Sequence, residues 1–353
     1  MNKLIRQVRQ RVSIASLDVS GWIDDGFPDF PSVESQQKIL SVIVKIAHTN
    51  GYYAQRVVKL ILERLEASQE KDSVILDGLY EELCELMSEK PMDPTETDIL
   101  EYTIEADNEE TDKDKVIRIR ESPRLLLGMG TTGLRTWDAS LFLSQYLVEV
   151  LRSKTPELAG VRMNFVNRSV IELGCGTGFV GICLYKLFRD QLKQMIFTDG
   201  DTRLIDRIST NFALNDMSID AKDLKVCKLW WGEDDFPNTE INTIVAADVT
   251  YDGSVIPDLV ETLNEAMSQD NGKYGRVDTA YIAATVRNSS TMAIWTEYLE
   301  MGKKDQIWEW EVIESSRNPN KVTTDLSAGD NSWKSVWYPI GVSEIRIYKL
   351  SRM

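Results

Sequence analysis

Hydrophobic residues in the first third of the chain recur at the spacing of an α-helix. Ile75, Leu79, Leu83 and Leu86 repeat at intervals of three or four positions, so they would line one face of a helix. Two earlier segments have the same periodicity and read KILSVIVKIAH and AQRVVKLILERLE. We therefore predict a helical N-terminal extension over residues 1–104, with these apolar stripes in its core.

A different pattern begins at Val116. The segment VIRIRE alternates apolar and charged residues, which is typical of a half-buried strand. Further apolar runs are separated by amphipathic segments or an acidic loop, and they read SVIEL, QMIFTD, LKVCKLWW, NTIVAADV and TAYIAATV. IWEWEVI and SEIRIYKL close the chain as two late strands, which we expect residues 316–342 to join as a hairpin loop. This alternation predicts an α/β fold, a doubly wound parallel sheet with helices on both faces.

The two regions are separated by the acidic segment EADNEETDKDK at residues 105–115. It contains no aromatic residue and is densely charged, as is typical of an exposed linker. We place the domain boundary in this linker, so that residues 116–353 form the α/β domain.

The charge balance narrows the choice of partners. The chain of 353 residues carries 56 acidic and 40 basic side chains, a formal net charge of −16. Since nucleic acids and anionic membranes require a basic protein face, neither is expected as a direct partner. No apolar run approaches the ~20 residues of a membrane span, and the first residues lack the apolar core of a signal peptide. A cytoplasmic location is therefore expected.

The composition of the chain argues against a metal site and against a Ser-His-Asp triad. The chain has one histidine, His48, and four cysteines without a C-x-x-C pair. This pattern indicates neither a metal site nor a disulfide framework, and it argues against a Ser-His-Asp triad. We interpret His48 as a structural residue at a helix end.

Two glycine-rich stretches compete for the role of the cofactor-binding turn. Gly128, Gly130 and Gly133 have G-x-G-x-x-G spacing, but Pro123 breaks the strand before them. The second stretch, VIELGCGTGFVG, follows a buried strand and opens a helix, and Asp199 ends the next strand, where Rossmann-type folds bind ribose. We assign the cofactor to the second stretch. The glycines of the first stretch are expected to give its backbone the freedom to form a tight loop that crosses the cofactor pocket.

The second stretch departs from the dinucleotide fingerprint at one position. Glu172 directly precedes Leu173 and Gly174, and a carboxylate there would repel a pyrophosphate. S-adenosylmethionine has no phosphate and carries an amine and a sulfonium cation, so the carboxylate suits it, either at the ligand or holding the loop. The pattern predicts a class I methyltransferase, with a nicotinamide-binding enzyme as the alternative.

Four motifs extend this prediction to a family. They are TTGLRTW, ELGCGTG, LWWGE and AADVTY. From about Val116 onward, the chain resembles the seven-β-strand protein lysine methyltransferases. The segments RESPRLLLGMGTTGLRTWDAS and AATVRNSSTM most resemble those of the branch that acts on eukaryotic elongation factor 2. The resemblance implies a mainly parallel, seven-stranded Rossmann-like sheet, S-adenosylmethionine as cofactor, and a lysine of elongation factor 2 as substrate.

The resemblance also implies roles for matching positions. Trp137 would pack against the methionine part of the cofactor, Asp199 would bind the ribose and Trp231 would flank the adenine. Asp248 and Tyr251 would face the substrate amine. The remaining cofactor contacts would come from Leu173, Gly174, Cys175, Gly176 and Ala247.

Reaction chemistry independently supports the pair Asp248 and Tyr251. Methyl transfer needs a neutral amine aligned with the methyl group, whereas a lysine amine is protonated near neutral pH. A carboxylate can hold the amine and receive its proton, and a tyrosine can form a wall. Alternatively, Asp248 caps the following segment and Tyr251 is a packing residue. Trp230 and Asp201 are alternative candidates for the adenine and ribose contacts.

Other functions fit the same core. These are a non-catalytic interaction module, a small-molecule methyltransferase and a nucleic-acid methyltransferase. The last usually carries an Asn/Asp-Pro-Pro-aromatic motif where this chain reads DVTYDG. We expect a monomer that acts on a protein, with N-terminal helices that either bind this substrate or cover the sheet.

Overall fold

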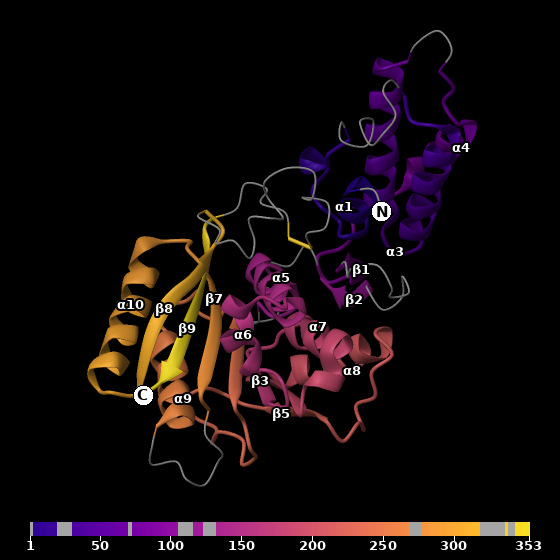
Figure 1. Ribbon diagram of the computed structural model, residues 1–353. Helices are drawn as coiled ribbons and strands as arrows, with labels where there is room; N and C mark the ends of the chain where they lie inside the picture. The colour runs from indigo at the N-terminus through magenta and orange to yellow at the C-terminus, as the bar shows by residue number, and fades with distance from the viewer. Residues whose placement is uncertain are drawn as a thin grey trace. The chain divides into compact units, whose positions relative to one another are not determined.

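The computed structural model describes residues 3–19, 30–69, 73–104, 116–122, 132–268, 277–317, 336–337 and 343–353. They form two compact units, each with its own hydrophobic core (Figure 1). The N-terminal unit comprises residues up to Thr103 and a short stretch from Arg118. The second unit, from here on the C-terminal unit, contains the large sheet.

Helices form most of the N-terminal unit. Its elements are α1 (Lys3–Arg9), η1 (Ile14–Ser16), α3 (Val33–Ala67), α4 (Asp77–Glu85), η2 (Leu86–Ser88), β1 (Asp98–Thr103) and β2 (Val116–Glu121). The side chain of Ser32 accepts a hydrogen bond from Ser35 N–H and so caps the start of α3. Non-helical backbone angles at Asn50 bend α3 near its middle. Most of the apolar residues of the predicted stripes are buried in the core of this unit, while Ile75 and Leu83 are partly buried against it.

The sequence analysis did not predict the small sheet of this unit. β1 pairs with β2 in a two-stranded sheet, with Leu100 and Tyr102 buried. The six-residue alternation of DILEYT follows three helical stretches, and its partner strand lies beyond the acidic segment. A pattern this short carries little weight without its partner. The domain boundary at residues 105–115 lies outside the described residues and stays a prediction.

One buried carboxylate joins three parts of the N-terminal unit. Asp98 of β1 accepts hydrogen bonds from Arg11 Nε at 2.7 Å, Thr49 Oγ1 at 2.8 Å and Asn50 Nδ2 at 2.9 Å. Asp98 is fully buried, so this set of donors supplies the pairing that a buried charge requires. Asn50 lies at the bend of α3, and the bend is therefore fixed to β1.

A seven-stranded, mainly parallel sheet forms the centre of the C-terminal unit, as predicted. Its strand order is β5-β4-β3-β6-β7-β9-β8. The strands are β3 (Ser169–Leu173), β4 (Gln194–Asp199), β5 (Leu224–Lys228), β6 (Thr243–Ala247), β7 (Thr279–Thr285), β8 (Trp308–Ser315) and β9 (Ile345–Arg352). Only β9 runs antiparallel to its neighbours, β7 and β8. The pairing of β8 with β9 agrees with the predicted hairpin, whose loop lies mostly outside the described residues.

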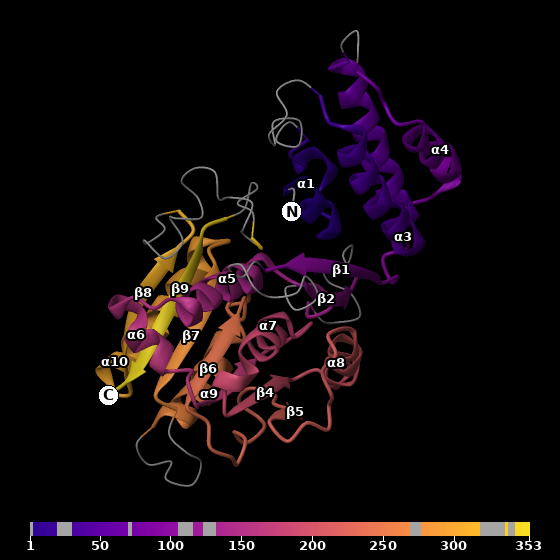
Figure 2. The same cartoon turned by 45° about the vertical axis from the view of Figure 1, so that its right-hand side comes forward.

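Helices cover both faces of this sheet, which confirms the doubly wound fold. They are α5 (Asp138–Arg152), α6 (Pro156–Met163), α7 (Phe179–Phe188), η3 (Arg189–Gln191), α8 (Thr202–Leu214), α9 (Ile256–Met267) and α10 (Ser289–Lys304). α5, α7 and α8 lie on one face, and α9 and α10 on the other (Figure 2). Trp295 of α10 and Leu259 of α9 are fully buried against the sheet.

The strand register places several predicted residues at one edge of the sheet. In the parallel pairing of β3 with β6, Leu173 lies opposite Ala246. The carboxyl ends of these strands therefore coincide, and Asp199 ends β4 on the other side of β3. This is the edge at which open α/β sheets bind ligands.

A buried acid fixes the helix that follows this edge. Glu172 of β3 is 3% exposed, and its Oε2 accepts a hydrogen bond of 2.9 Å from Gly181 N–H in the first turn of α7. A Cβ on Gly181 would lie 2.6 Å from that oxygen, so the close approach requires glycine. Burial raises the pKa of Glu172 to about 8. Glu172 thus holds the start of α7, one of the two roles considered from the sequence.

This raised pKa predicts a specific pH dependence of stability. The folded protein retains the Glu172 proton up to about pH 8, whereas the unfolded chain releases it near the ordinary value of 4.5. The contribution of Glu172 to the free energy of unfolding is therefore fully present below pH 4.5 and is lost as the pH rises through 8. Between these two values the free energy of unfolding falls by up to about 1.4 kcal/mol per pH unit. Glu172→Gln removes this titration. We expect its free energy of unfolding, relative to wild type, to rise between pH 6 and pH 9 in urea denaturation. Glu157→Gln, at an exposed position of α6, is the control and should follow wild type; parallel curves for Glu172→Gln would contradict the assignment.

Candidate active site

The turn between β3 and α7 has a backbone that side chains would not permit. Gly174 and Gly176 have φ values of +62° and +52°, in the left-handed region that favours glycine. A Cβ on Gly174 would lie 3.0 Å from Val249 and 3.1 Å from the Trp231 ring. The turn is therefore a narrow backbone cradle bordered by an indole, a shape that suits a flat ligand lying across it.

Asp199 is anchored beside this cradle. Its Oδ2 accepts a hydrogen bond of 3.0 Å from Gly176 N–H, and its Oδ1 accepts one of 3.0 Å from Asp201 N–H. Burial raises the pKa of Asp199, while these two backbone hydrogen bonds lower it. A backbone hydrogen bond from Gly200 also lowers this pKa, and a carboxylate has about four acceptor positions, so Asp199 can still accept a hydrogen bond from a neighbouring hydroxyl group.

Asp201, the alternative ribose candidate, is used differently. Its side chain accepts a hydrogen bond from the backbone N–H of Arg203 and so caps the start of α8. It also pairs with the Arg203 guanidinium at 2.6 Å. The geometry therefore favours Asp199 as the carboxylate that faces the cradle.

The first glycine-rich stretch meets the second one at Gly133. A Cβ on Gly133 would lie 3.1 Å from Gly176 Cα and would overlap the Leu204 side chain. The φ of Gly133 is not in the left-handed region, so its glycine is required by close approach and not by backbone freedom. This corrects the expected reason for glycine at this position. Gly128 and Gly130 lie outside the described residues.

Trp137 belongs to the segment that begins at Gly133. Thr136 Oγ1 lies 2.9 Å from Thr177 Oγ1 of the glycine turn, in a buried hydrogen bond. Trp137 Nε1 donates to Thr132 O at 3.0 Å, which fixes the orientation of the indole. Gly133, Thr136 and Trp137 therefore form one short segment that is fastened to the turn.

The Trp137 ring lies among charged groups. The guanidinium carbons of Arg135 and Arg287 lie 5.3 and 5.1 Å from its centroid, within the range of cation–π contacts. Burial raises the pKa of the neighbouring Asp138, which begins α5. The ring thus joins the glycine turn to a cluster of opposite charges.

Asp248 occupies the end of β6 in an unusual backbone state. Its φ is +58°, and its amide donates to Ala283 O at 2.8 Å. Its side chain is 4% exposed and accepts hydrogen bonds from both terminal nitrogens of Arg287, with Nη1 to Oδ1 at 2.8 Å. From the sequence, this carboxylate is expected to face the substrate amine or to cap the following segment, and the pairing with Arg287 was not predicted. Arg287 follows β7, which lies beside β6 only in the folded sheet, so no local pattern of the sequence indicates this pairing.

The two adjacent tryptophans after β5 lie on different parts of the edge. Trp231 packs over Gly174 and is half-buried, and its indole N–H finds no acceptor among the described residues. Trp230 is 48% exposed and packs over Gly200, next to Asp199. Trp231 therefore borders the glycine turn itself, whereas Trp230 lies against the residue that follows Asp199.

The remaining predicted residues lie at the same edge. Leu173 is fully buried, Ala247 is half-buried, and Tyr251 is 43% exposed beyond Asp248. Burial raises the pKa of the Cys175 thiol well above its usual range, which favours a neutral wall residue over a redox centre. All predicted site residues thus belong to the C-terminal unit.

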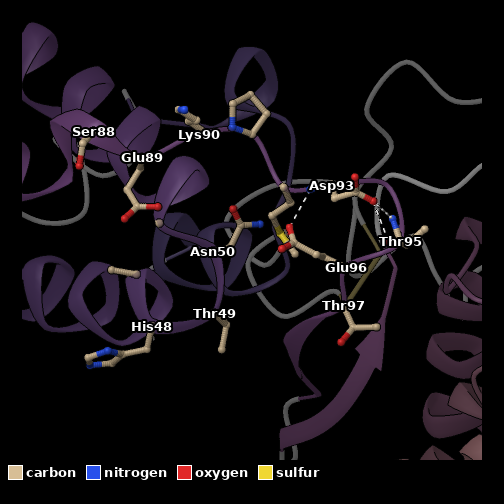
Figure 3. Close-up of a pocket in the computed structure, with 14 residues that line it drawn as sticks. His48, Thr49, Asn50, Ser88, Glu89, Lys90, Asp93, Thr95, Glu96 and Thr97 are labelled. Atoms are coloured by element: carbon tan, nitrogen blue, oxygen red, sulfur yellow. Dashed lines mark hydrogen bonds between the residues drawn. The ribbon is translucent and has the colours of Figure 1, made fainter.

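A separate hollow of about 1030 Å³ lies in the N-terminal unit, beside the bend of α3 (Figure 3). Glu89 and Asn50 line it, and Asp93 N–H donates to Glu96 Oε2 at 2.7 Å. It offers no glycine turn or strand end, so it does not resemble a nucleotide site. Across the described ranges, no three histidine, cysteine or acidic side chains are grouped to hold a metal. No helix in those ranges is long and apolar enough to cross a membrane.

The arrangement can hold an adenosyl ligand and present its tail to charged groups. The cradle could hold a flat ring beside Trp231, and Asp199 could accept hydrogen bonds from hydroxyl groups. The ligand's tail would extend toward Trp137, where two carboxylates and two guanidinium groups surround the indole. These residues fit S-adenosylmethionine.

Comparison with known proteins agrees with this chemistry. A family model described as lysine methyltransferase matches residues 112–309. The chain is 29% identical to the protein-lysine N-methyltransferase EFM3 of Saccharomyces cerevisiae over 321 residues, 87% of each chain. It is 30% identical to EFM3 of Chaetomium thermophilum, over 68% of this chain and 69% of that one. It is also 30% identical to the protein-lysine N-methyltransferase EEF2KMT of Homo sapiens, over 53% and 54% of the two chains.

The family match covers more than half of the chain and includes the glycine turn, Asp199 and Asp248. The chain therefore belongs to the lysine methyltransferase family and is an S-adenosylmethionine-dependent protein-lysine N-methyltransferase.

Proposed function

We propose that this enzyme methylates a lysine of eukaryotic elongation factor 2. Support comes from the relatives named EEF2KMT and from the motifs that resemble the branch acting on this factor. The net charge of −16 supports a protein as the direct partner and disfavours a nucleic acid. We further propose a monomer that works in the cytoplasm.

The cofactor site in this proposal follows the geometry of the sheet edge. Asp199 binds the ribose hydroxyls, Trp231 flanks the adenine and Trp137 packs against the methionine part. The remaining contacts come from Leu173, Gly174, Cys175, Gly176 and Ala247. The observation that carries this assignment is the hydrogen bond from Gly176 N–H to Asp199, which places a carboxylate directly beside the glycine cradle.

In the proposed reaction, Asp248 and Tyr251 act on the substrate amine. When bound, S-adenosylmethionine supplies a methyl group activated by its sulfonium. Asp248 holds the lysine nitrogen and takes its proton, directly or through water, and Tyr251 forms a wall that aims the lone pair. The nitrogen lone pair forms the new N–C bond as the C–S bond breaks, and the bonding pair stays on sulfur. Alignment and proton removal are the two tasks of the protein.

A direct assay tests the substrate. Elongation factor 2 purified from cells that lack this methylation is incubated with the enzyme and radiolabelled S-adenosylmethionine. We expect label in elongation factor 2, on a single lysine peptide by mass spectrometry, and none in the premethylated factor. Label in another protein of the same lysate, with none in elongation factor 2, would refute the target.

Trp137→Ala tests the cofactor site. Loss of the indole removes a large packing surface, so we expect the Kd for S-adenosylhomocysteine to rise about tenfold or more by calorimetry. Trp310→Ala, at a half-buried tryptophan of β8, is the matched control and should leave the Kd unchanged. An unchanged Kd for Trp137→Ala would show that this segment does not contact the cofactor.

Asp248→Asn tests the amine-binding role. Asparagine tolerates a left-handed φ, so the fold should persist while the charge is lost. We expect kcat to fall about 100-fold or more, with a cofactor Kd within about twofold of wild type. Asp216→Asn is the control, because Asp216 is exposed and has the same φ of +58°. Wild-type turnover for Asp248→Asn would eliminate Asp248 as the proton acceptor.

A further inference from the structure

Arg287 is a charged residue that contacts Asp248 directly and to which the proposed reaction gives no role. It follows β7, and its backbone is fixed on both sides: Val286 N–H donates to Glu344 O at 2.7 Å and Arg287 N–H to Thr285 O at 2.9 Å. The side chain is 36% exposed, so the guanidinium can meet both the buried site and solvent. Its position is therefore set by the sheet and not by a free loop.

The guanidinium makes two specific contacts. Its two terminal nitrogens each donate to a different oxygen of Asp248, which fixes the plane of that carboxylate. Its central carbon lies 5.1 Å from the centroid of Trp137. One side chain thus connects the carboxylate proposed to hold the amine with the indole proposed to pack against the cofactor.

Asp248 needs this partner. A carboxylate whose side chain is 4% exposed loses most of its hydration, and a buried charge without a counter-charge is strongly destabilised. The carboxylate of Asp138, at the start of α5, is a like charge that interacts with Asp248. Asp138 repels the Asp248 charge, which leaves Arg287 as the guanidinium in direct contact with it.

The pairing still leaves room for a substrate. A carboxylate has about four acceptor positions, and the guanidinium uses two of them, one on each oxygen. A lysine nitrogen can use a remaining position, so Asp248 can bridge Arg287 and the substrate.

We propose that Arg287 is a positioning residue, which orients Asp248 to receive the lysine amine and acts through that carboxylate. This inference rests on the proposed role of Asp248 as the group that holds the amine. Arg287 remains paired during the reaction, and it does not take the place of the substrate.

Two substitutions separate orientation from charge. Arg287→Met keeps much of the apolar stem and removes the guanidinium, while Arg287→Lys keeps a charge without the two-pronged geometry. We expect Arg287→Met to lower kcat about 10- to 100-fold, with the Kd for S-adenosylhomocysteine within about twofold of wild type. Arg287→Lys should recover part of the loss. Arg189→Met is the matched control, because it removes a two-pronged pair between Arg189, which precedes β4, and Asp223, which precedes β5, at the opposite edge of the sheet.

A double variant that combines Arg287→Met with Asp248→Asn tests whether Arg287 acts on kcat through Asp248. If Arg287 acts through Asp248, Arg287→Met causes little further loss of kcat in the Asp248→Asn background. Equal losses in both backgrounds, or a wild-type kcat for Arg287→Met, would overturn the proposal. A higher kcat/KM for the protein substrate would also overturn it, because Arg287 would then compete with the lysine.

The wild-type enzyme separates this inference from the proposed substrate. Labelling of elongation factor 2 by wild type, together with unchanged kinetics of Arg287→Met, would refute the role of Arg287 alone. If wild type labels a different protein, the substrate proposal fails. The same comparison is then made on that protein, with the same criteria.

Discussion

The close approach of two backbone segments at Gly133 and Gly176 is the constraint on which the site depends. At this contact a Cβ on either residue would press against the other segment, and Gly176 also has a left-handed φ. The Gly176 amide can therefore reach Asp199, which joins the ends of β3 and β4. On the other side, the segment that begins at Gly133 carries Trp137 to the same edge. The glycine turn and the segment that carries Trp137 are thus held together at one point of contact.

The site combines this rigid cradle with a charged cluster at its open side. Asp248 and Arg287 come from the ends of two adjacent strands, so the sheet itself aligns them. Their pairing satisfies a buried charge and orients it, which a single exposed acid could not achieve. One guanidinium, that of Arg287, thus contacts both the Trp137 indole and the Asp248 carboxylate. In the proposed roles, the glycine turn together with Asp199, Trp231 and Trp137 binds the cofactor, and Asp248 receives the proton.

The sequence carried the fold and the position of the cradle because both depend on local patterns. Strand–turn–helix order and a strand-end acid predicted the sheet and the glycine turn between β3 and α7. Pairings between distant segments were not predictable in the same way. β1 was missed because its partner lies beyond the acidic segment, and Arg287 was missed because its partner Asp248 belongs to another strand. Gly133 was found, but for the wrong reason, since close approach leaves no trace in a single sequence.

The central claim is that the glycine cradle and Asp199 form the cofactor site. The most direct measurement is a crystal structure of the enzyme with S-adenosylhomocysteine. The account predicts ribose hydroxyls on the Asp199 carboxylate, adenine beside Trp231, and the ligand's sulfur on the side of Trp137 and Asp248. A ligand bound elsewhere, or one whose ribose does not contact Asp199, would contradict it.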